Sequence, residues 1–477
     1  MNIKKKIRED AMNKIDEALG EKPESVTRKK RHILPKVLIP LGAAALVAGV
    51  IVGGIAIGKM NVSPIDEFSK RNPYLVKARE SREAHGLVIS KKSADIYSNF
   101  VLSSALKVLS DADTSMSYSP FDAFVNFAAI AYFSSDDISN ALLPMFGSPS
   151  LNELADAVYE LTYALGTPTF SMEQMYGQNE PVKMEHGGYS ANSLWTGKLP
   201  LKNDEEGKKA RVALVEKFLS SIIQGKPDAE SVSKWLESCL PEGYEIPKLT
   251  LPDADEAAAF VSSYFLKINN RSRDADYRNY LSGNHHMPYS WNGKAIQSEY
   301  LSHITWDGAT YYESDHLLGG SYLSVDFFLP KDKEASPNSI LSEVMEQAYA
   351  RKHAAFYEIN VPYFTIADQH IDLLEEVYAP YCSKRVGVME KVFQYEMELM
   401  DVSQHSKVNL DYEGFSSSSV TISYMVPTSA QSGESFHLDV DRPFVFQSKK
   451  VLKMDNEHYA ELPTCIGLVY DPAYQAR

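Results

Sequence analysis

The pattern of apolar and polar positions changes character along the chain. Residues 37–58 form an apolar run without a charge, and a polar, proline-containing stretch follows up to residue 92. From residue 93 onward the apolar positions recur first at the three- and four-residue spacing of helices, and later at the alternate positions of strands. The pattern predicts a membrane helix, a stalk and one large domain of mixed elements.

The first half of this domain predicts helices. Apolar residues recur at helical spacing in Ala94–Ser110 and Phe121–Phe133, and Ser119 and Pro120 are a typical N-cap and first-turn proline for the second segment. The same periodicity predicts further helices at Asp137–Met145, Leu151–Leu165, 204–223, 229–240, Ile340–Ala350 and Ile371–Tyr378.

Strand signals gather in the second half. Short runs rich in β-branched and aromatic residues occur at Ala258–Ile268, Thr310–Tyr312, Tyr322–Leu329, Tyr357–Phe364, Val408–Leu410, Val420–Met425, Arg442–Phe446 and Cys465–Val469. Helices followed by strands predict an α+β fold built on a large sheet. No internal repeat or second linker divides residues 93–477, so we expect a single domain there.

The apolar run 37–58 is long enough to cross a membrane. A helix rises 1.5 Å per residue, so this run spans a hydrocarbon layer of about 30 Å. Basic residues crowd its N-terminal flank, at Arg28, Lys29, Lys30, Arg31 and Lys36. The positive-inside rule therefore predicts that the N-terminus is cytoplasmic and that the chain after the run is extracellular. A cleaved signal peptide is the alternative, but its apolar region is normally only about 7–15 residues long.

These features predict four regions in a single-pass protein of the cell membrane. They are a cytoplasmic tail over residues 1–36, a transmembrane signal anchor over 37–58, a stalk over 59–92 and an extracellular folded domain over 93–477.

Composition and charge narrow the classes of function. The formal net charge of −15 argues against a nucleic-acid-binding protein, which would present a basic face. The cysteines Cys239, Cys382 and Cys465 are odd in number and widely separated, so they form neither a disulfide framework nor a metal-binding spacing. We expect them to be buried free thiols.

The sequence carries no signature of an enzyme. No G-x-S-x-G, P-loop or G-x-G-x-x-G motif is present, and the serine run at 416–419 has no partner for nucleophilic catalysis. The histidines His285, His286, His303 and His316 match no metal-binding spacing. We therefore expect no catalytic residue, no metal and no cofactor.

The stretch from Asp411 to Phe446 is the unusual feature that remains. Strand-like residues lead to Gly414, four consecutive serines follow, and about fifteen poorly patterned residues separate them from the next strand. Loops longer than about 12–15 residues without structure of their own are usually functional or disordered. This segment is either a flexible connection or a loop presented to a partner.

Several sequence blocks, in order from about Ala94 to Pro472, resemble the serpin (serine protease inhibitor) family. They are SYSPFDAFVNFAAIAYF at 117–133, FVSSYFLKI at 260–268, YLSVDFFLP at 322–330, VPYFTI at 361–366, VDRPFVF at 440–446, and Cys465–Val469 with Pro472. The chain departs from the family at Ala131 and Tyr132, where Gly-Ala is usual, and the block at 260–268 lacks the usual asparagine.

The resemblance implies helices packed on a large central sheet with smaller sheets, and an exposed reactive loop at 411–446. The resemblance also implies that a serine protease, or a cysteine protease as a second class of target, would cleave that loop, whose hinge would then insert into the sheet and trap the enzyme. The hinge is implied at Gly414, Phe415, Ser416, Ser417, Ser418 and Ser419. The scissile bond is implied at Thr428-Ser429 by counting from Gly414, and nearer Ser432 by counting back from Pro443.

Two hinge positions leave a second function open. Phe415 stands where inhibitors of the family usually have threonine or serine, and Tyr412 stands where they usually have an acidic residue. A large side chain at a buried position costs roughly 1–3 kcal/mol and could slow insertion. The alternative is a serpin-fold binding or structural module on the cell surface that does not trap proteases.

Overall fold

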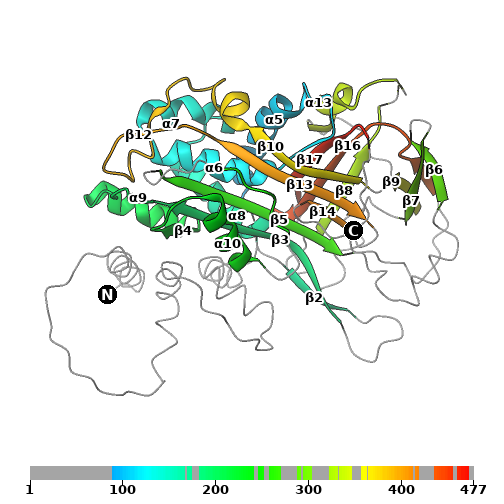
Figure 1. Ribbon diagram of the computed structural model, residues 1–477, viewed down its shortest axis with the longest axis horizontal. Helices are drawn as coiled ribbons and strands as arrows, with labels where there is room; N and C mark the ends of the chain where they lie inside the picture. The colour runs from blue at the N-terminus through cyan, green and yellow to red at the C-terminus, as the bar shows by residue number, and fades with distance from the viewer. Residues whose placement is uncertain are drawn as a thin grey trace, which may run out of the picture.

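A central sheet of seven strands organises the folded part of the chain (Figure 1). The computed structural model describes residues 89–166, 169–173, 182–240, 245–251, 257–269, 287–291, 294–302, 322–330, 332, 334–345, 356–362, 364–411, 414–417, 435–454 and 459–471. The apolar run 37–58, predicted to be a membrane anchor, lies outside these residues, as do the tail before it and the first part of the stalk. Within the described residues, no helix combines the length and hydropathy needed to cross a bilayer.

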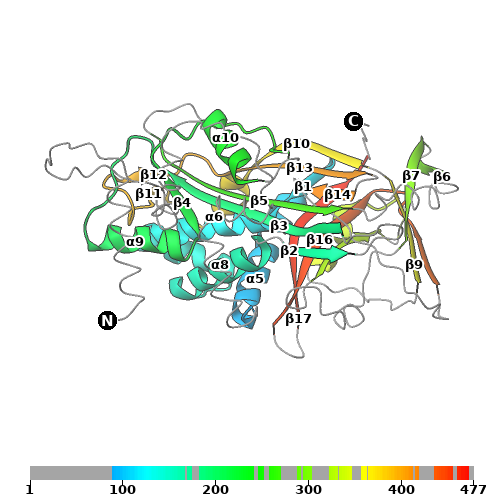
Figure 2. The same cartoon turned by 90° about the horizontal axis from the view of Figure 1, so that it is seen from below.

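The helices of the described residues flank the sheet. They are α5 (Lys91–Leu109), α6 (Pro120–Phe133), α7 (Asp136–Leu142), α8 (Leu151–Gly166), α9 (Glu205–Glu216), α10 (Ala229–Cys239) and α13 (Leu341–Met345), with the 3₁₀ helices η1 (Leu143–Phe146) and η3 (Pro337–Ile340) and the π-helix η4 (Leu374–Tyr378). Helix α10 lies on one face of the central sheet, and α5, α6 and α8 lie on the other (Figure 2).

Helix α6 is the central helix of the core. It begins at Pro120, whose fixed φ and missing N–H suit the first turn of a helix. Its phenylalanines are fully buried: Phe121 packs edge-on against Tyr264 with ring centroids 5.0 Å apart, and Phe124 packs against Phe100 of α5 at 5.6 Å. Because nearly every face of α6 is covered, the helix fixes the sheet on one side and α5 on the other.

The central sheet has the strand order β10-β13-β14-β5-β3-β2, and β4 pairs with β3. The strands are β10 (Phe364–Asp372), β13 (Ser403–Asp411), β14 (Gly414–Ser417), β5 (Ala259–Asn269), β3 (Val182–Trp195), β2 (Thr169–Glu173) and β4 (Ser220–Ile223). Strand β14 is antiparallel to both of its neighbours.

Three smaller sheets complete the fold. One has the order β1-β17-β16-β8, with β1 (Met116–Tyr118), β17 (Tyr459–Val469), β16 (Phe444–Lys453) and β8 (Tyr322–Phe328). A second has the order β15-β9-β7-β6, with β15 (Ser435–Asp439), β9 (Phe356–Pro362), β7 (Lys294–Ser302) and β6 (Met287–Trp291). The third is the pair β11 (Val386–Val388) and β12 (Met397–Glu398). Helices on a large sheet with smaller sheets beside it confirm the predicted α+β class.

The structure corrects the predicted elements of the first half. Residues 204–223 were expected to be one helix, but α9 ends at Glu216 and Ser220–Ile223 form strand β4, which pairs with β3. Strand β3 itself was not predicted. Its glycines interrupt the strand pattern, and at Gly188 the ring of Tyr264 fills the space where a side chain would lie. The packing of Tyr264 from β5 therefore explains a glycine that the strand pattern of the sequence does not predict.

Two predictions in the second half were also wrong in detail. The strand expected at Tyr357–Phe364 is divided between β9 and β10, which belong to different sheets. The helix expected at Ile371–Tyr378 is the short π-helix Leu374–Tyr378, because Ile371 still belongs to β10. The strand expected at Val420–Met425 lies outside the described residues.

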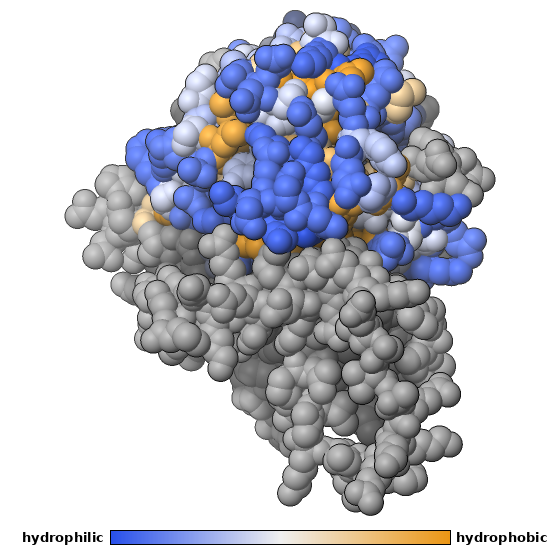
Figure 3. Space-filling model, turned by 90° about the vertical axis from the view of Figure 1, so that its left-hand side faces the viewer, coloured by the Kyte–Doolittle hydropathy of each residue, from blue (hydrophilic) through white to orange (hydrophobic). Residues whose placement is uncertain are grey.

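The surface at one end of the domain is mostly hydrophilic (Figure 3). Large hydrophobic side chains that are exposed among the described residues are Val386, Tyr395 and Met400. Tyr395 and Met400 are 60% and 73% exposed, and both lie at the rim of the cavity described below.

Gly467 of β17 tests the packing of this strand against its two neighbours, β1 and β16. A Cβ at this position would overlap the ring of Phe446 and would lie 2.7 Å from the carbonyl oxygen of Met116. We expect Gly467→Ala to lower the free energy of unfolding by roughly 1–3 kcal/mol, because backbone and ring must both shift.

The measurement is urea denaturation of the folded domain. Gly225→Ala is the matched control, because there the nearest atom, in the ring of Trp195, would lie 3.4 Å away at ordinary contact distance. Equal free energies of unfolding for the two variants would contradict the prediction.

Candidate functional site: a gap in the central sheet

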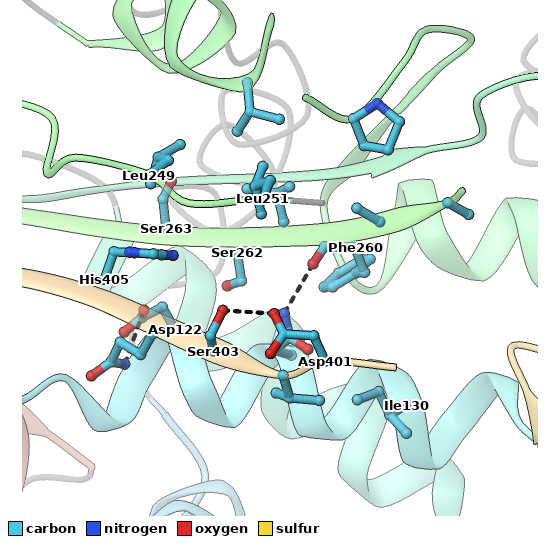
Figure 4. Close-up of a pocket in the computed structure, with 18 of the residues that line it drawn as sticks. Asp122, Ile130, Leu249, Leu251, Phe260, Ser262, Ser263, Asp401, Ser403 and His405 are labelled. Carbon is cyan, nitrogen blue, oxygen red and sulfur yellow. Dashed lines mark hydrogen bonds between the residues drawn. The ribbon is translucent and has the colours of Figure 1, made fainter. Parts of the chain in front are cut away.

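The central sheet is open between β5 and β13. Strand β14 joins them at one end only, pairing with Leu266–Asn269 of β5 and Val408–Asp411 of β13. Beyond β14, the described segments Ala259–Phe265 of β5 and Ser403–Ser406 of β13 pair with their outer neighbours, β3 and β10, but not with each other. A cavity of about 930 Å³ lies along this gap (Figure 4).

Helix α6 forms the floor of the gap. Ser119, Asp122, Asn126 and Ile130 recur at helical spacing and all line the cavity. Asn126 Nδ2 donates to the carbonyl oxygen of Phe260 on β5 at 3.0 Å, so a side chain of the floor holds one wall (Figure 4).

Gln404 of β13 holds the opposite wall to the start of α6. Its Oε1 accepts from the backbone N–H of Ser119 at 2.8 Å, and its Nε2 donates to the carbonyl oxygen of Ser119 at 2.7 Å and to Asp122 Oδ2 at 3.2 Å. Ser406, two residues along, donates to the carbonyl oxygen of Ser117 at 3.1 Å. The core-facing side of β13 is therefore polar inside the gap.

Asp122 carries an unsatisfied oxygen in this floor. Although the residue borders the cavity, its Oδ1 is out of contact with solvent and accepts no hydrogen bond from the described residues. Burial raises the pKa of this carboxyl to about 6, against the opposing effect of the hydrogen bonds from Ser119, Gln404 and the backbone.

The opposite face of the gap has a cover. Val232 and Leu236 of α10, together with Leu249 and Leu251 from the segment that follows it, line the cavity from that side.

Two polar contacts tie this cover to β13. Lys407 Nζ lies 2.5 Å from Glu245 Oε2, and the backbone N–H of Thr250 donates to His405 Nε2 at 3.5 Å. Both groups of the ion pair are partly exposed, so the pair adds little stability. The cover is therefore held by weak contacts and apolar packing.

The structure places part of the predicted hinge at this gap. Gly414, Phe415, Ser416 and Ser417 form β14, so their backbone already occupies one end of the space between β5 and β13. Ser418, Ser419 and the candidate scissile residues Thr428 and Ser429 lie outside the described residues.

Sequence reasoning did not single out the residues of the floor. It identified Ser119 and Pro120 only as a helix start, and it missed Asp122, Asn126 and Gln404. Ser119, Asp122 and Asn126 recur at helical spacing on an otherwise apolar helix. This pattern is a signal for Asp122 and Asn126, since polar residues rarely share the buried face of a core helix.

The described residues include no candidate site for metal binding or for thiol chemistry. No group of His, Cys, Asp or Glu residues there could hold a metal ion. Cys239, Cys382 and Cys465 are buried and form no disulfide with one another. The histidines considered above as ligands, His285, His286, His303 and His316, lie outside the described residues.

No protein-family model matches this sequence, and no curated protein matches it significantly. Solved structures do match. Serpin48 from the insect Tenebrio molitor shares 14% identity over 80% of this chain and 98% of its own, with a TM-score of 0.54. AtSerpin1 from Arabidopsis, in its native stressed conformation, shares 15% identity over 80% of this chain and 98% of its own, with a TM-score of 0.51.

A third match is human thyroxine-binding globulin in complex with its hormone. It shares 12% identity over 80% of this chain and 99% of its own, with a TM-score of 0.53. Nearly the whole length of each of these proteins is covered, and the fold predicted from the sequence blocks is confirmed. The chain has the serpin fold.

Proposed function

We propose that this protein inhibits serine proteases at the cell surface, as a suicide substrate that inserts its cleaved loop into the gap between β5 and β13. The observation that carries the proposal is the gap itself, a sheet position between two facing strands where the described part of the chain places the four residues of β14. The likeness to other serpins supports the fold on which this reaction depends.

The reaction begins as ordinary proteolysis. The serine oxygen of the protease attacks the carbonyl carbon of the scissile bond, the peptide bond breaks, and the proton goes to the leaving amine. The new C-terminus remains joined to the protease as an ester. Inhibition requires that the loop inserts before water hydrolyses this ester.

The pairing of β14 specifies how the loop would insert. Ser417 is opposite Val408 and Leu266, and paired residues in an antiparallel sheet share a face. Continued in the same register, Ser419 would reach Ser406 and Tyr264, and Thr421 would reach Gln404 and Ser262. Small hydroxyl residues would then meet the polar floor of the gap.

Insertion has a clear source of energy. An added strand forms hydrogen bonds with both neighbours, and each contributes roughly 0.5–1.5 kcal/mol net. The strand would also fill a cavity of about 930 Å³ and pair backbone groups of β5 and β13 that have no strand partner on that side among the described residues. Cleavage releases the constraint that keeps the loop outside.

Phe415 is less of an obstacle than the sequence suggests. Its backbone is already paired with Leu410 and Ile268, so this position lies within the sheet before any cleavage. Any free-energy cost of a large residue at position 415 therefore destabilises the uncleaved protein and does not slow the later insertion step.

The cellular location of the protein and the kind of protease that it inhibits are also parts of the proposal. The apolar run 37–58 and its basic N-terminal flank support a single-pass anchor with the inhibitory domain outside the cell. The candidate scissile bond Thr428-Ser429 suits a protease with a small binding pocket, whereas Tyr424 or Met425 would suit one that prefers large apolar residues.

A binding module is the second candidate. The complex of thyroxine-binding globulin with thyroxine is an example of a small molecule bound by the same fold. A loop that is cut without trapping the protease would favour this reading.

The proposal predicts covalent complexes. The extracellular domain is incubated with elastase-, subtilisin- and chymotrypsin-like proteases and analysed by denaturing electrophoresis. We expect an SDS-stable band at the summed mass of inhibitor and protease with at least one of them. Cleavage of the loop by every protease without such a band would contradict inhibition for that panel.

The register predicts a position where one residue decides between trapping and cleavage. Thr421→Arg places a charge opposite Gln404 in the buried floor, where an unpaired charge costs several kcal/mol. We expect this variant to be cut by the target protease at the wild-type rate but to form at least tenfold less complex. Thr421→Ser is the matched control and should trap like wild type. Equal complex yields from the arginine and serine variants would rule out this register.

A further inference from the structure

The cavity along the gap has a distinct region at its end farthest from β14. Strands β5 and β13 both begin there, at Ala259 and Ser403, whereas β14 pairs with the opposite end of each strand. Figure 4 shows Phe260, Asp401 and Ile130 on the same side of the cavity. The region that these three residues border is called the far end below.

The walls of the far end are apolar and come from segments that are distant in the sequence. Ile130 belongs to α6, Leu194 to β3 and Phe260 to β5. The cavity volume of about 930 Å³ lies within the range of about 300–1,000 Å³ that is usual for small-molecule pockets, which are mostly apolar. The chain from β11 to β13 supplies the largest share of the apolar lining: Met389, Phe393, Tyr395, Met397, Leu399, Met400 and Val402.

Residues 395–401 form the mouth of the far end, and two of their apolar side chains are exposed. Tyr395 and Met400 are two of the three large hydrophobic side chains that are exposed among the described residues. Exposed apolar side chains that gather at one place indicate a binding site, whereas scattered ones do not. Methionine is unbranched and adapts its shape to a bound molecule. The mouth therefore suits an apolar ligand.

The mouth is also acidic. Glu396, Glu398 and Asp401 line the cavity and are exposed, and none of them forms an ion pair with a described residue. Among the described lining residues, Lys407 is the single lysine or arginine, and it lies next to the β14 end of β13, paired with Glu245. The charged groups at the mouth are therefore negative.

Basic residues that are close to the mouth in the chain lie outside the cavity lining. Lys384 and Lys391 form ion pairs with α7, with Nζ–Oδ distances of 3.0 and 3.8 Å. Lys198 and Lys226 adjoin lining residues but do not line the cavity. The three carboxylates of the mouth thus have no basic partner within the lining of the far end.

The sequence of the reactive loop does not account for this charge. Residues 418–432 contain neither lysine nor arginine, so a strand formed from them would bring no positive group to the mouth. Three neighbouring carboxylates repel one another, and a cation placed among them lowers their electrostatic energy. The apolar walls and the acidic mouth together specify a ligand other than the loop.

We propose that the far end binds a lipophilic cation, a small molecule with an apolar body and an ammonium or guanidinium group. The apolar body lies against Ile130 and Phe260. The positive group lies at the mouth, near Glu398 and Asp401 and the ring of Tyr395, whose face also attracts a cation. This binding goes beyond the proposed function and does not depend on it.

The test compares two probes that differ in charge. Decyltrimethylammonium and decyl sulfate have the same apolar chain and opposite charges, and each is titrated into the folded domain at low ionic strength, below the concentration at which it forms micelles. Isothermal titration calorimetry measures the two dissociation constants. We expect the cation to bind at least tenfold more tightly than the sulfate. Equal binding of the two probes, or tighter binding of the sulfate, would overturn the proposal.

A triple variant locates the binding at the mouth. Glu396→Gln, Glu398→Gln and Asp401→Asn together keep the size of three exposed side chains and remove their charge, so the fold should be retained. We expect the affinity for decyltrimethylammonium to fall at least fivefold, and the affinity for decyl sulfate to stay the same or to rise.

A second triple variant controls for net charge. It removes the same number of carboxylates from exposed positions that do not line the cavity: Asp111→Asn, Glu216→Gln and Glu376→Gln. We expect this variant to bind decyltrimethylammonium within twofold of wild type. Equal losses of affinity in the two triple variants would mean that net charge alone attracts the probe, and the site would be wrong.

A bound cation would also oppose strand insertion, a consequence that rests on the proposed function. A strand that enters the gap beyond Gln404 needs the far end, so the ligand and the strand compete for the same space. Saturating decyltrimethylammonium should therefore lower the yield of the covalent complex with wild type more than with the mouth variant, which controls for effects of the probe on the protease.

The outcomes separate this site from the proposed function. A protein that binds the cation at the mouth but never forms a complex would overturn inhibition and leave the site in place. A protein that forms complexes and shows no preference for the cation would overturn the site and leave inhibition in place.

Discussion

The fold depends on a central sheet in which the position between β5 and β13 is only partly filled by the described residues. Strands β5 and β13 face each other across a gap in which, of the described residues, Gly414–Ser417 lie as a strand. Each strand keeps an outer partner, β3 or β10, and the helix α6 beneath them supplies side chains that stand in for some of the missing contacts. Under the proposed function, this gap is the place that more of the loop would fill.

Weak polar contacts border the gap between β5 and β13. Asn126 and Gln404 tie the two walls to α6, and the cover over the gap is held to β13 by an exposed ion pair and one long hydrogen bond. One oxygen of Asp122 accepts no hydrogen bond from the described residues. A state in which several groups are only partly satisfied stores free energy that a better-fitting strand can release.

Much of the fold could be predicted from sequence, for physical reasons that differ by element. Helix α6 was evident because Ser119 and Pro120 define its start and its apolar residues leave no exposed face. Strands β5, β8 and β17 were evident from their β-branched and aromatic residues. Strand β3 was missed, because the lack of a side chain at Gly188 makes sense only against the ring of Tyr264. The floor of the gap was missed for the same reason: Gln404 acquires its role only where β13 crosses the start of α6.

The central claim is that the gap accepts the cleaved loop as a strand, and thermal unfolding before and after limited proteolysis of the loop tests it most directly. If the strand inserts, the cleaved protein gains two rows of hydrogen bonds and loses a large cavity, so its Tm should rise by tens of degrees. A cleaved protein that melts at or below the temperature of the intact one would contradict the account.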